Sequence, residues 1–151
     1  MLDTTDKKLL NILQNDSKQT TKQLSLQLHL SVTAVYERIK KLENQKVIQK
    51  YVAMVDKSKI EKSFLVFCHV KLVQHTKEYV TTFEREVLKL EEVSECFHVS
   101  GDYDYILKIY VKDMDAYREF LITKLTAIKY IGSTQSTFSI EQVKNTTAIQ
   151  L

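Results

Sequence analysis

The spacing of the hydrophobic residues changes near residue 60, and this change restricts the fold more than any other feature. Before it, apolar residues recur every three or four positions, as they do on one face of a helix. After it, they occupy every second position from Phe64 to Leu72, as they do on one face of a strand. The sequence therefore predicts a helical first part followed by a part that contains a sheet.

Three short helices are expected within the first 45 residues. Asp3 or Thr4 can cap the first, and Thr20 with Gln23 has the spacing of a capping box at the start of the second. Ser31 can cap the third, whose inner stripe is Val35, Ile39 and Leu42. The connection at residues 29–31 leaves too little chain for parallel stacking. Two short helices joined in this way are typical of a helix-turn-helix.

The outer side of the third helix carries residues that suit contacts with DNA. At 100° per residue, the inner stripe turns Thr33, Glu37, Lys40 and Asn44 outward, with Tyr36 and Lys41 on the flanks. The same pattern would also fit the solvated face of an ordinary amphipathic helix. Arg38 lies nearer the buried edge and is either a phosphate contact or part of a structural ion pair. The candidate DNA-binding residues are Thr20, Thr21, Lys22, Ser31, Thr33, Tyr36, Glu37, Arg38, Lys40 and Lys41.

Charge is distributed unevenly along the chain. Residues 1–60 hold 11 Lys and Arg against 6 Asp and Glu, whereas residues 61–151 hold 11 against 13. The net charge is therefore +5 for residues 1–60 and −2 for residues 61–151. The basic N-terminal part is suited to binding double-stranded DNA, and the acidic C-terminal part is not.

The domain boundary is expected in the polar stretch after the helices. Val47-Ile48 and the run from Tyr51 to Val55 predict a short strand pair or wing. We place a helix-turn-helix domain at 1–54, a linker at 55–62 and a second domain at 63–151. In the second domain the expected order is strand 64–72, helix 79–90, strands 93–100 and 105–111, helix 117–128 and strand 131–143. This βαββαβ order predicts a ferredoxin-like domain with helices on one face of the sheet, and an α+β protein overall.

The face of that sheet away from the helices is expected to be partly apolar. Leu65, Phe67, Ile106 and Tyr110 fall on the alternate parity of their strands. Apolar side chains on an uncovered face favour a homodimer, sheet against sheet.

Composition excludes several classes of protein. No apolar run approaches the length of a membrane span, and the first residues lack the pattern of a secretion signal, so a cytoplasmic protein without membrane contact is expected. Cys68 and Cys96 lie far apart in strand-like runs, and the four histidines lack the spacing of zinc ligands. We expect no disulfide, metal or cofactor.

Taken in order, several motifs resemble the Lrp/AsnC family, the leucine-responsive and feast/famine regulators. They are Leu2-Asp3 with Asp6 and Leu9-Leu10, Leu30-Ser31 followed by Glu37-Arg38 and Leu42-Glu43, Val47-Ile48, and the run from Val99 to Tyr105 with Asp113-Met114 and Tyr117. The resemblance covers essentially the whole chain. It implies a transcription regulator whose second domain binds a small effector, usually an amino acid, between dimers. It also implies assembly of dimers into larger rings, commonly octamers.

The resemblance directs attention to the segment Gly101-Asp102-Tyr103-Asp104. As a connection between two strands it can be a simple hairpin turn. Alternatively, main-chain groups freed by the glycine and one or both carboxylates receive the two ends of an amino acid, and hydroxyls of a neighbouring subunit complete the pocket. The candidate effector-binding residues are Gly101, Asp102, Tyr103, Asp104, Thr134, Ser136 and Thr137.

Three positions depart from the family pattern. His29, Lys46 and the pair Lys129-Tyr130 stand where the family usually has glycine or Pro-Gly, which puts the local backbone in doubt rather than the function. Two other functions remain as alternatives: an amino-acid-sensing assembly protein without specific DNA binding, and an enzyme similar to the sirohaem decarboxylases. The complete helix-turn-helix opposes the first, and the acidic loop opposes the second.

Overall fold

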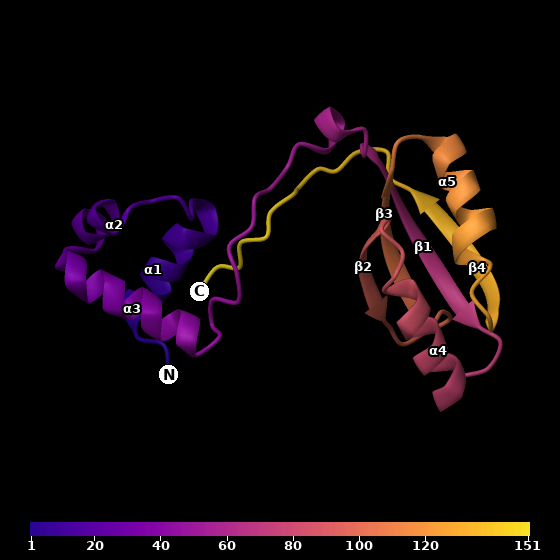
Figure 1. Ribbon diagram of the computed structural model, residues 1–151, viewed down its shortest axis with the longest axis horizontal. Coiled ribbons are helices and arrows are strands. Elements are labelled where there is room, and N and C mark those ends of the chain that lie inside the picture. The colour runs from indigo at the N-terminus through magenta and orange to yellow at the C-terminus, as the bar shows by residue number, and fades with distance from the viewer. The chain divides into compact units, whose positions relative to one another are not determined.

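The computed structural model describes residues 1–151, and its contacts divide the chain into two compact units (Figure 1). The helical unit comprises Met1–Met54 together with Val143–Leu151, and the sheet unit comprises Val55–Gln142. The sequence predicts that residues 143–151 are part of the second domain, whereas their contacts and hydrogen bonds in the structure are with the helices.

Helix α1 (Thr4–Asn15), α2 (Thr21–Leu28) and α3 (Val32–Asn44) form the helical unit. The three expected caps are all present, because the side chains of Asp3, Thr20 and Ser31 each accept a hydrogen bond from the main chain of the following helix. The capping box between Thr20 and Gln23 is also present. The core consists of Leu9, Leu10, Leu13, Leu24, Val35 and Leu42.

The strand pair expected after α3 does not form within the chain. Residues 49–56 are extended but belong to no ladder. The N–H groups of Val47 and Ile48 instead donate to the carbonyl of Leu42, at 3.0 and 3.2 Å, and so close the end of the helix. A short 3-10 turn, Lys57–Ile60, follows at the start of the sheet unit.

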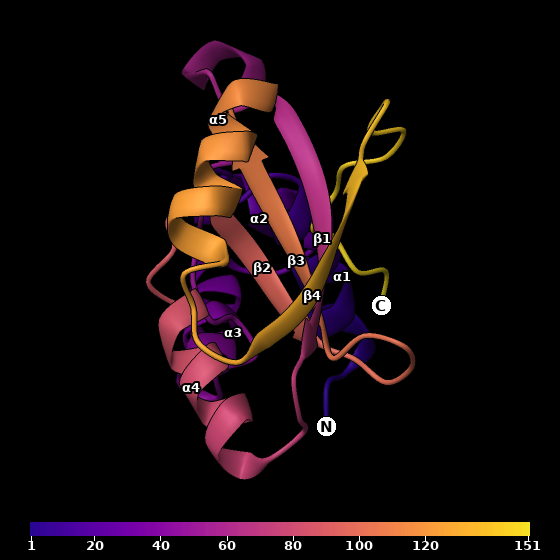
Figure 2. The same cartoon turned by 90° about the vertical axis from the view of Figure 1, so that its right-hand side faces the viewer.

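The sheet unit has the predicted βαββαβ order (Figure 2). Its elements are β1 (Phe64–Leu72), α4 (Lys77–Val87), β2 (Val93–His98), β3 (Tyr105–Val111), α5 (Met114–Phe120) and β4 (Ile131–Phe138). The strands are antiparallel in the order β2-β3-β1-β4. Helix α5 continues into a π-helical turn, Leu121–Leu125, and both β2 and β4 end earlier than expected.

Both helices cover one face of the sheet. Phe83 and Val87 of α4 and Tyr117 and Phe120 of α5 pack with alternate residues of the strands, as the period of two predicts. The opposite side, which we call the open face, carries Leu65, Phe67, His69, Phe97, Ile106, Lys108, Tyr110, Gln135 and Thr137.

The two cysteines are free and lie on the covered face. Burial raises the pKa of Cys96 to about 11 and also raises the pKa of Cys68, so both thiols stay protonated near neutral pH. None of the helices combines the length and apolar character that a membrane span requires.

At the three places where the family usually has glycine or Pro-Gly, one residue of this chain has a left-handed backbone conformation with positive φ. His29, Lys46 and Tyr130 have φ values of 54°, 58° and 73°. A side chain in this region is strained, and glycine is not. Tyr130 gains compensating contacts, because its ring stacks on Tyr79 with centroids 3.8 Å apart and its hydroxyl donates to Glu78.

We predict that Lys46→Gly stabilises the helical unit. Removing the left-handed strain should gain more than the glycine costs through the flexibility of the unfolded chain, leaving a net increase of about 0.5 to 1 kcal/mol in the free energy of unfolding. Chemical denaturation measures it. Lys50→Gly, at an exposed position without positive φ, is the control and should not stabilise. A loss of stability in Lys46→Gly would contradict the argument.

Candidate nucleic-acid interface and effector loop

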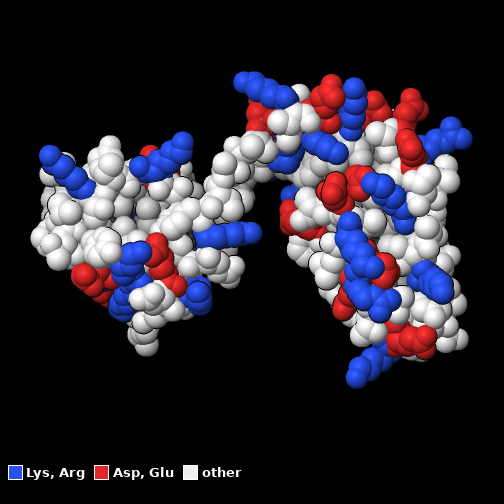
Figure 3. All heavy atoms as spheres, viewed as in Figure 1, with Lys and Arg blue, Asp and Glu red and all other residues white.

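The outer side of α3 is exposed as predicted. Val35 and Leu42 are fully buried, whereas Thr33, Tyr36, Glu37, Lys40 and Lys41 are exposed. On the face of the helical unit seen in Figure 3, Lys and Arg side chains stand apart or mix with carboxylates, and they form no unbroken basic patch. Such a surface can make individual phosphate contacts along a groove.

Lys40 is oriented by its neighbours on the helix. Its Nζ lies 2.9 Å from Glu43 Oε2 and 5.7 Å from the centroid of the Tyr36 ring. The hydrogen bond to Glu43, with the charge of that carboxylate, raises the pKa of Lys40, so the side chain remains charged. Lys40 and Tyr36 therefore present a cation and an aromatic ring next to each other on one exposed surface.

Arg38 is held in a structural ion pair, which was one of the two interpretations left open by the sequence. Its Nη1 lies 2.7 Å from Asp3 Oδ2 and 2.6 Å from Asp6 Oδ1, and Asp6 is fully buried. The guanidinium, with the N–H of Asp6, lowers the pKa of Asp3. The contribution of Asp3 to stability is therefore complete above its usual pKa of about 4 and is lost as the pH falls through the lowered value.

The other candidate DNA-binding residues differ in whether their side chains are exposed and free of hydrogen bonds within the chain. The hydroxyls of Thr20 and Ser31 are occupied by helix capping, Thr21 is half-buried, and Lys22 is exposed. Sequence reasoning missed Val32, the first residue of α3, which is 48% exposed. Val32 directly follows the predicted cap Ser31, so the sequence already placed it at the start of the third helix. The N-terminal residues of a recognition helix are the ones that face the base edges.

The loop between β2 and β3 is built around Asp104. Its Oδ2 accepts the N–H of Leu72 at 2.7 Å, and its Oδ1 lies 3.0 Å from Nδ1 of His75. Its main chain also donates to Val70 and accepts from Val99. This carboxylate therefore ties the loop to the end of β1.

Several effects determine the protonation of Asp104. Burial by itself would raise the pKa of the carboxyl group. The hydrogen bonds from Leu72 and His75, with the charges of His75 and His98, outweigh burial and lower the pKa. Asp104 is therefore an anion near neutral pH.

Gly101 and Asp102 form the exposed tip of this loop. Gly101 has a φ of 127°, a value that side chains rarely adopt, although an added Cβ would meet no atom within 4 Å. Any substitution there costs backbone strain rather than a clash. Asp102 is exposed, and its carboxylate takes part in none of the bonds that hold Asp104.

Tyr103 connects the loop to the open face of the sheet. Its hydroxyl donates to Gln135 on β4, and its ring lies 5.3 Å from the His69 ring. Near Asp104, His75 stacks on His98, which in turn stacks on Tyr105. The candidate residues taken from the sequence do not include His75, His69 and Gln135, which contact Asp104 or Tyr103. The antiparallel pairing of β1 with β3, which brings the end of one strand beside the start of the other, was the signal that could have found His75.

The three candidate hydroxyls on β4 do not share a face. Thr134 and Ser136 pair with Val70 and Cys68 on the covered face, whereas Thr137 pairs with Phe67 on the open face. The Ser136 hydroxyl lies 2.5 Å from that of Tyr117 and is occupied. The structure therefore brings the loop next to Gln135 but does not assemble all seven candidate residues within one chain.

Sequence comparisons match the two parts of the chain to two different profiles, and the second profile includes residues 143–149. Residues 2–49 match the profile of a winged helix-turn-helix DNA-binding domain, and residues 65–149 match the profile of the Lrp/AsnC ligand binding domain. The Leucine-responsive regulatory proteins of Salmonella typhimurium and Escherichia coli are 38% identical to this chain over 143 residues, which cover 95% of this chain and 87% of each relative.

Solved structures with this fold cover nearly the whole chain. A transcriptional regulator from Neisseria meningitidis in complex with L-Met has a TM-score of 0.94 at 30% identity, covering 99% of this chain and 96% of that one. An AsnC family transcriptional regulator from Agrobacterium tumefaciens has a TM-score of 0.94 at 35% identity, covering 98% and 96%.

A helix-turn-helix joined to a ligand-binding ferredoxin-like domain defines a class of DNA-binding transcription regulators. Within that class, the chain belongs to the Lrp/AsnC family.

We predict that Asp6→Ala destabilises the helical unit by about 2 kcal/mol, because it leaves Arg38 without its buried partner. Thermal unfolding followed by circular dichroism measures the loss. Asp16→Ala removes an exposed carboxylate just after α1 and should change stability little. Equal stability of the Asp6 and Asp16 variants would show that the ion pair contributes nothing.

Proposed function

We propose that this regulator binds specific sites in double-stranded DNA through α3, and that its assembly and DNA binding respond to a small effector of the amino-acid class. The observation that carries the proposal is the match of one chain to both family profiles, together with the similarity to a regulator solved with L-Met. In this proposal the chain acts through binding alone and has no catalytic activity or cofactor.

The effector binds at the loop from Gly101 to Asp104, between dimers. An amino acid presents an ammonium and a carboxylate, so its site needs both an anion and hydrogen-bond donors. Asp102 offers an exposed carboxylate at the tip of this loop, and Asp104 keeps the loop in shape through Leu72 and His75. Of the hydroxyls on β4, Thr137 is exposed on the open face and is the one best able to serve a neighbouring subunit.

The chain forms a homodimer through the open face, and dimers assemble further, most simply into an octamer. Phe97 is 48% exposed on this face and pairs with the partly exposed Ile106, and the partly exposed Phe67 lies on β1 of the same face. Apolar surface of this kind favours burial against a second copy. A ligand that contacts two dimers would favour whichever assembly holds both walls of its site at the right separation.

Light scattering on the full chain tests the dimer. Phe67→Glu places a charge at the centre of the open face and should convert the dimer into a folded monomer. Leu88→Glu, at a residue that is 83% exposed beyond the end of α4, is the matched control and should leave the assembly unchanged. A dimer that persists in Phe67→Glu would exclude the open face as the interface.

Measurements of DNA binding by variants should distinguish the residues that contact phosphates from the residues that contact bases. Lys41→Ala should weaken binding to all sequences and lower the slope of log affinity against log salt by about 1, whereas changing Thr33, Tyr36 or Glu37 should alter the preference among sequences. Lys40→Ala should behave like Lys41→Ala. Lys89→Ala, in the sheet unit, is the control. Electrophoretic shifts that are identical for all these variants would exclude α3 as the recognition helix and favour a sensor without specific DNA binding.

Binding of the effector should depend on Asp104. Calorimetry across the twenty amino acids should identify at least one that binds, and Asp104→Ala should abolish that binding while DNA binding without effector stays nearly intact. Asp115→Ala, a charge change on α5, is the control. If no amino acid binds the wild type, or if Asp104→Ala binds equally well, then the loop is only a turn.

A further inference from the structure

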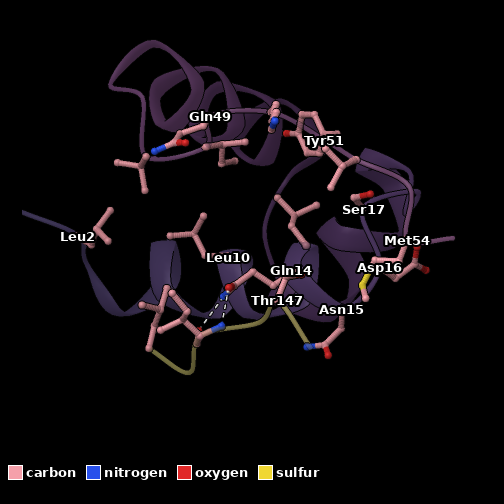
Figure 4. A pocket seen from close by; sticks show the side chains of 17 residues that line it. Leu2, Leu10, Gln14, Asn15, Asp16, Ser17, Gln49, Tyr51, Met54 and Thr147 are labelled. Atoms are coloured by element: carbon pink, nitrogen blue, oxygen red, sulfur yellow. Dashed lines mark hydrogen bonds between the residues drawn. The ribbon is translucent and has the colours of Figure 1, made fainter. Parts of the chain in front are cut away.

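The segment 143–151 is held on α1 by side-chain amides that imitate a neighbouring strand. The Nε2 of Gln14 donates to the carbonyl of Ile149 at 2.8 Å, and the N–H of Ile149 donates to Gln14 Oε1 at 2.8 Å. Asn11 makes the same pair of bonds with Leu151, at 3.5 and 3.3 Å. Figure 4 shows the Gln14 side chain directed at this segment. Each amide thus satisfies both polar groups of one main-chain residue, as a strand partner does.

The spacing of the two clamps fits an extended chain on a helix. Asn11 and Gln14 are three residues apart and lie on one side of α1, while Ile149 and Leu151 are two residues apart, the repeat of a strand. The bonds recognise the backbone, so the geometry demands an extended segment rather than a particular side chain.

Apolar packing adds little to this attachment. Ile149 is 72% exposed and Leu151 is 46% exposed, although both border a largely apolar cavity of about 710 Å³. Leu13 and Ile48 also line it, as do Leu2, Leu10 and Met54, which are labelled in Figure 4. The attachment therefore depends on a few hydrogen bonds at the surface, and the entropy of ordering each residue is comparable with the net gain from one such bond. Attached and released states should differ little in free energy.

We propose that residues 143–151 are a reversible strap that docks on α1 of its own chain, with Gln14 as the principal clamp and Asn11 as the weaker one. The strap follows β4 directly in the sequence. Docking therefore gives the helical unit a second tether to the sheet unit, besides the linker after Met54. Release leaves the helical unit attached at one end only, with more freedom to orient its recognition helix.

Hydrogen exchange on the full chain tests the docking. The Ile149 amide should exchange more slowly than an unprotected amide but faster than the amides in the middle of α1. Gln14→Ala should speed its exchange by about fivefold or more, since it removes both bonds to that residue. Gln27→Ala, which removes an exposed glutamine from α2, is the matched control and should leave the Ile149 amide unchanged.

Three outcomes would overturn the proposal. They are an unprotected Ile149 amide in the wild type, equal protection in Gln14→Ala, and protection as strong as in the middle of α1, since the last excludes reversible release. None of these readouts involves DNA or an effector, so they test the strap separately from the proposed function.

Crosslinking identifies which chain supplies the strap. Asn15 and Thr147 both border the cavity, and replacing both with cysteine leaves the clamps in place (Figure 4). A short bifunctional maleimide should then join them within one chain, so that mass spectrometry of the monomer band finds the peptides containing residues 15 and 147 crosslinked to each other. Asn15→Cys and Thr147→Cys alone are the controls. Covalent dimers formed by the double variant only would show that the strap comes from a second copy and would overturn docking on its own chain.

Discussion

The ion pair between Asp6 and Arg38 fixes the position of α3 against α1. Because Asp6 is fully buried, its charge has to be compensated, and Arg38 approaches it to 2.6 Å. The pair ties the middle of α3 to the first turn of α1 and removes Arg38 from the set of free cations. The orientation of the helix follows, with Tyr36 and Lys40 outward and Val35 and Leu42 inward.

Asp104 has a structural role in the sheet unit that is comparable to that of the Asp6–Arg38 ion pair in the helical unit. Its carboxylate bonds to Leu72 and His75, and its main chain bonds to Val70 of β1 and to Val99 at the start of the loop, so the loop is held in place by the chain itself. A preordered site loses less entropy on binding. The exposed tip at Gly101 and Asp102 is the part that remains for a partner or a ligand.

Three of the four left-handed residues other than glycine stand where the family usually has glycine. His29 and Lys46 end α2 and α3, and Tyr130 precedes β4. A side chain at these positions is strained, and the stacking of Tyr130 on Tyr79 shows one way in which the strain is offset.

Local rules in the sequence determined the helix caps, the two hydrophobic periods, the βαββαβ order and the turn at Gly101, since each depends on residues close together in the chain. Thr134 and Ser136 lie on the opposite face of β4 from Thr137. This also follows from the alternation of side chains along a strand, so the sequence could have predicted it. Three features were decided by tertiary structure alone: the partner of Arg38, the bonds of Asp104 to Leu72 and His75, and the docking of residues 143–151 on α1. Each joins groups that are distant in the sequence, and nothing in the local pattern of either partner specifies the other.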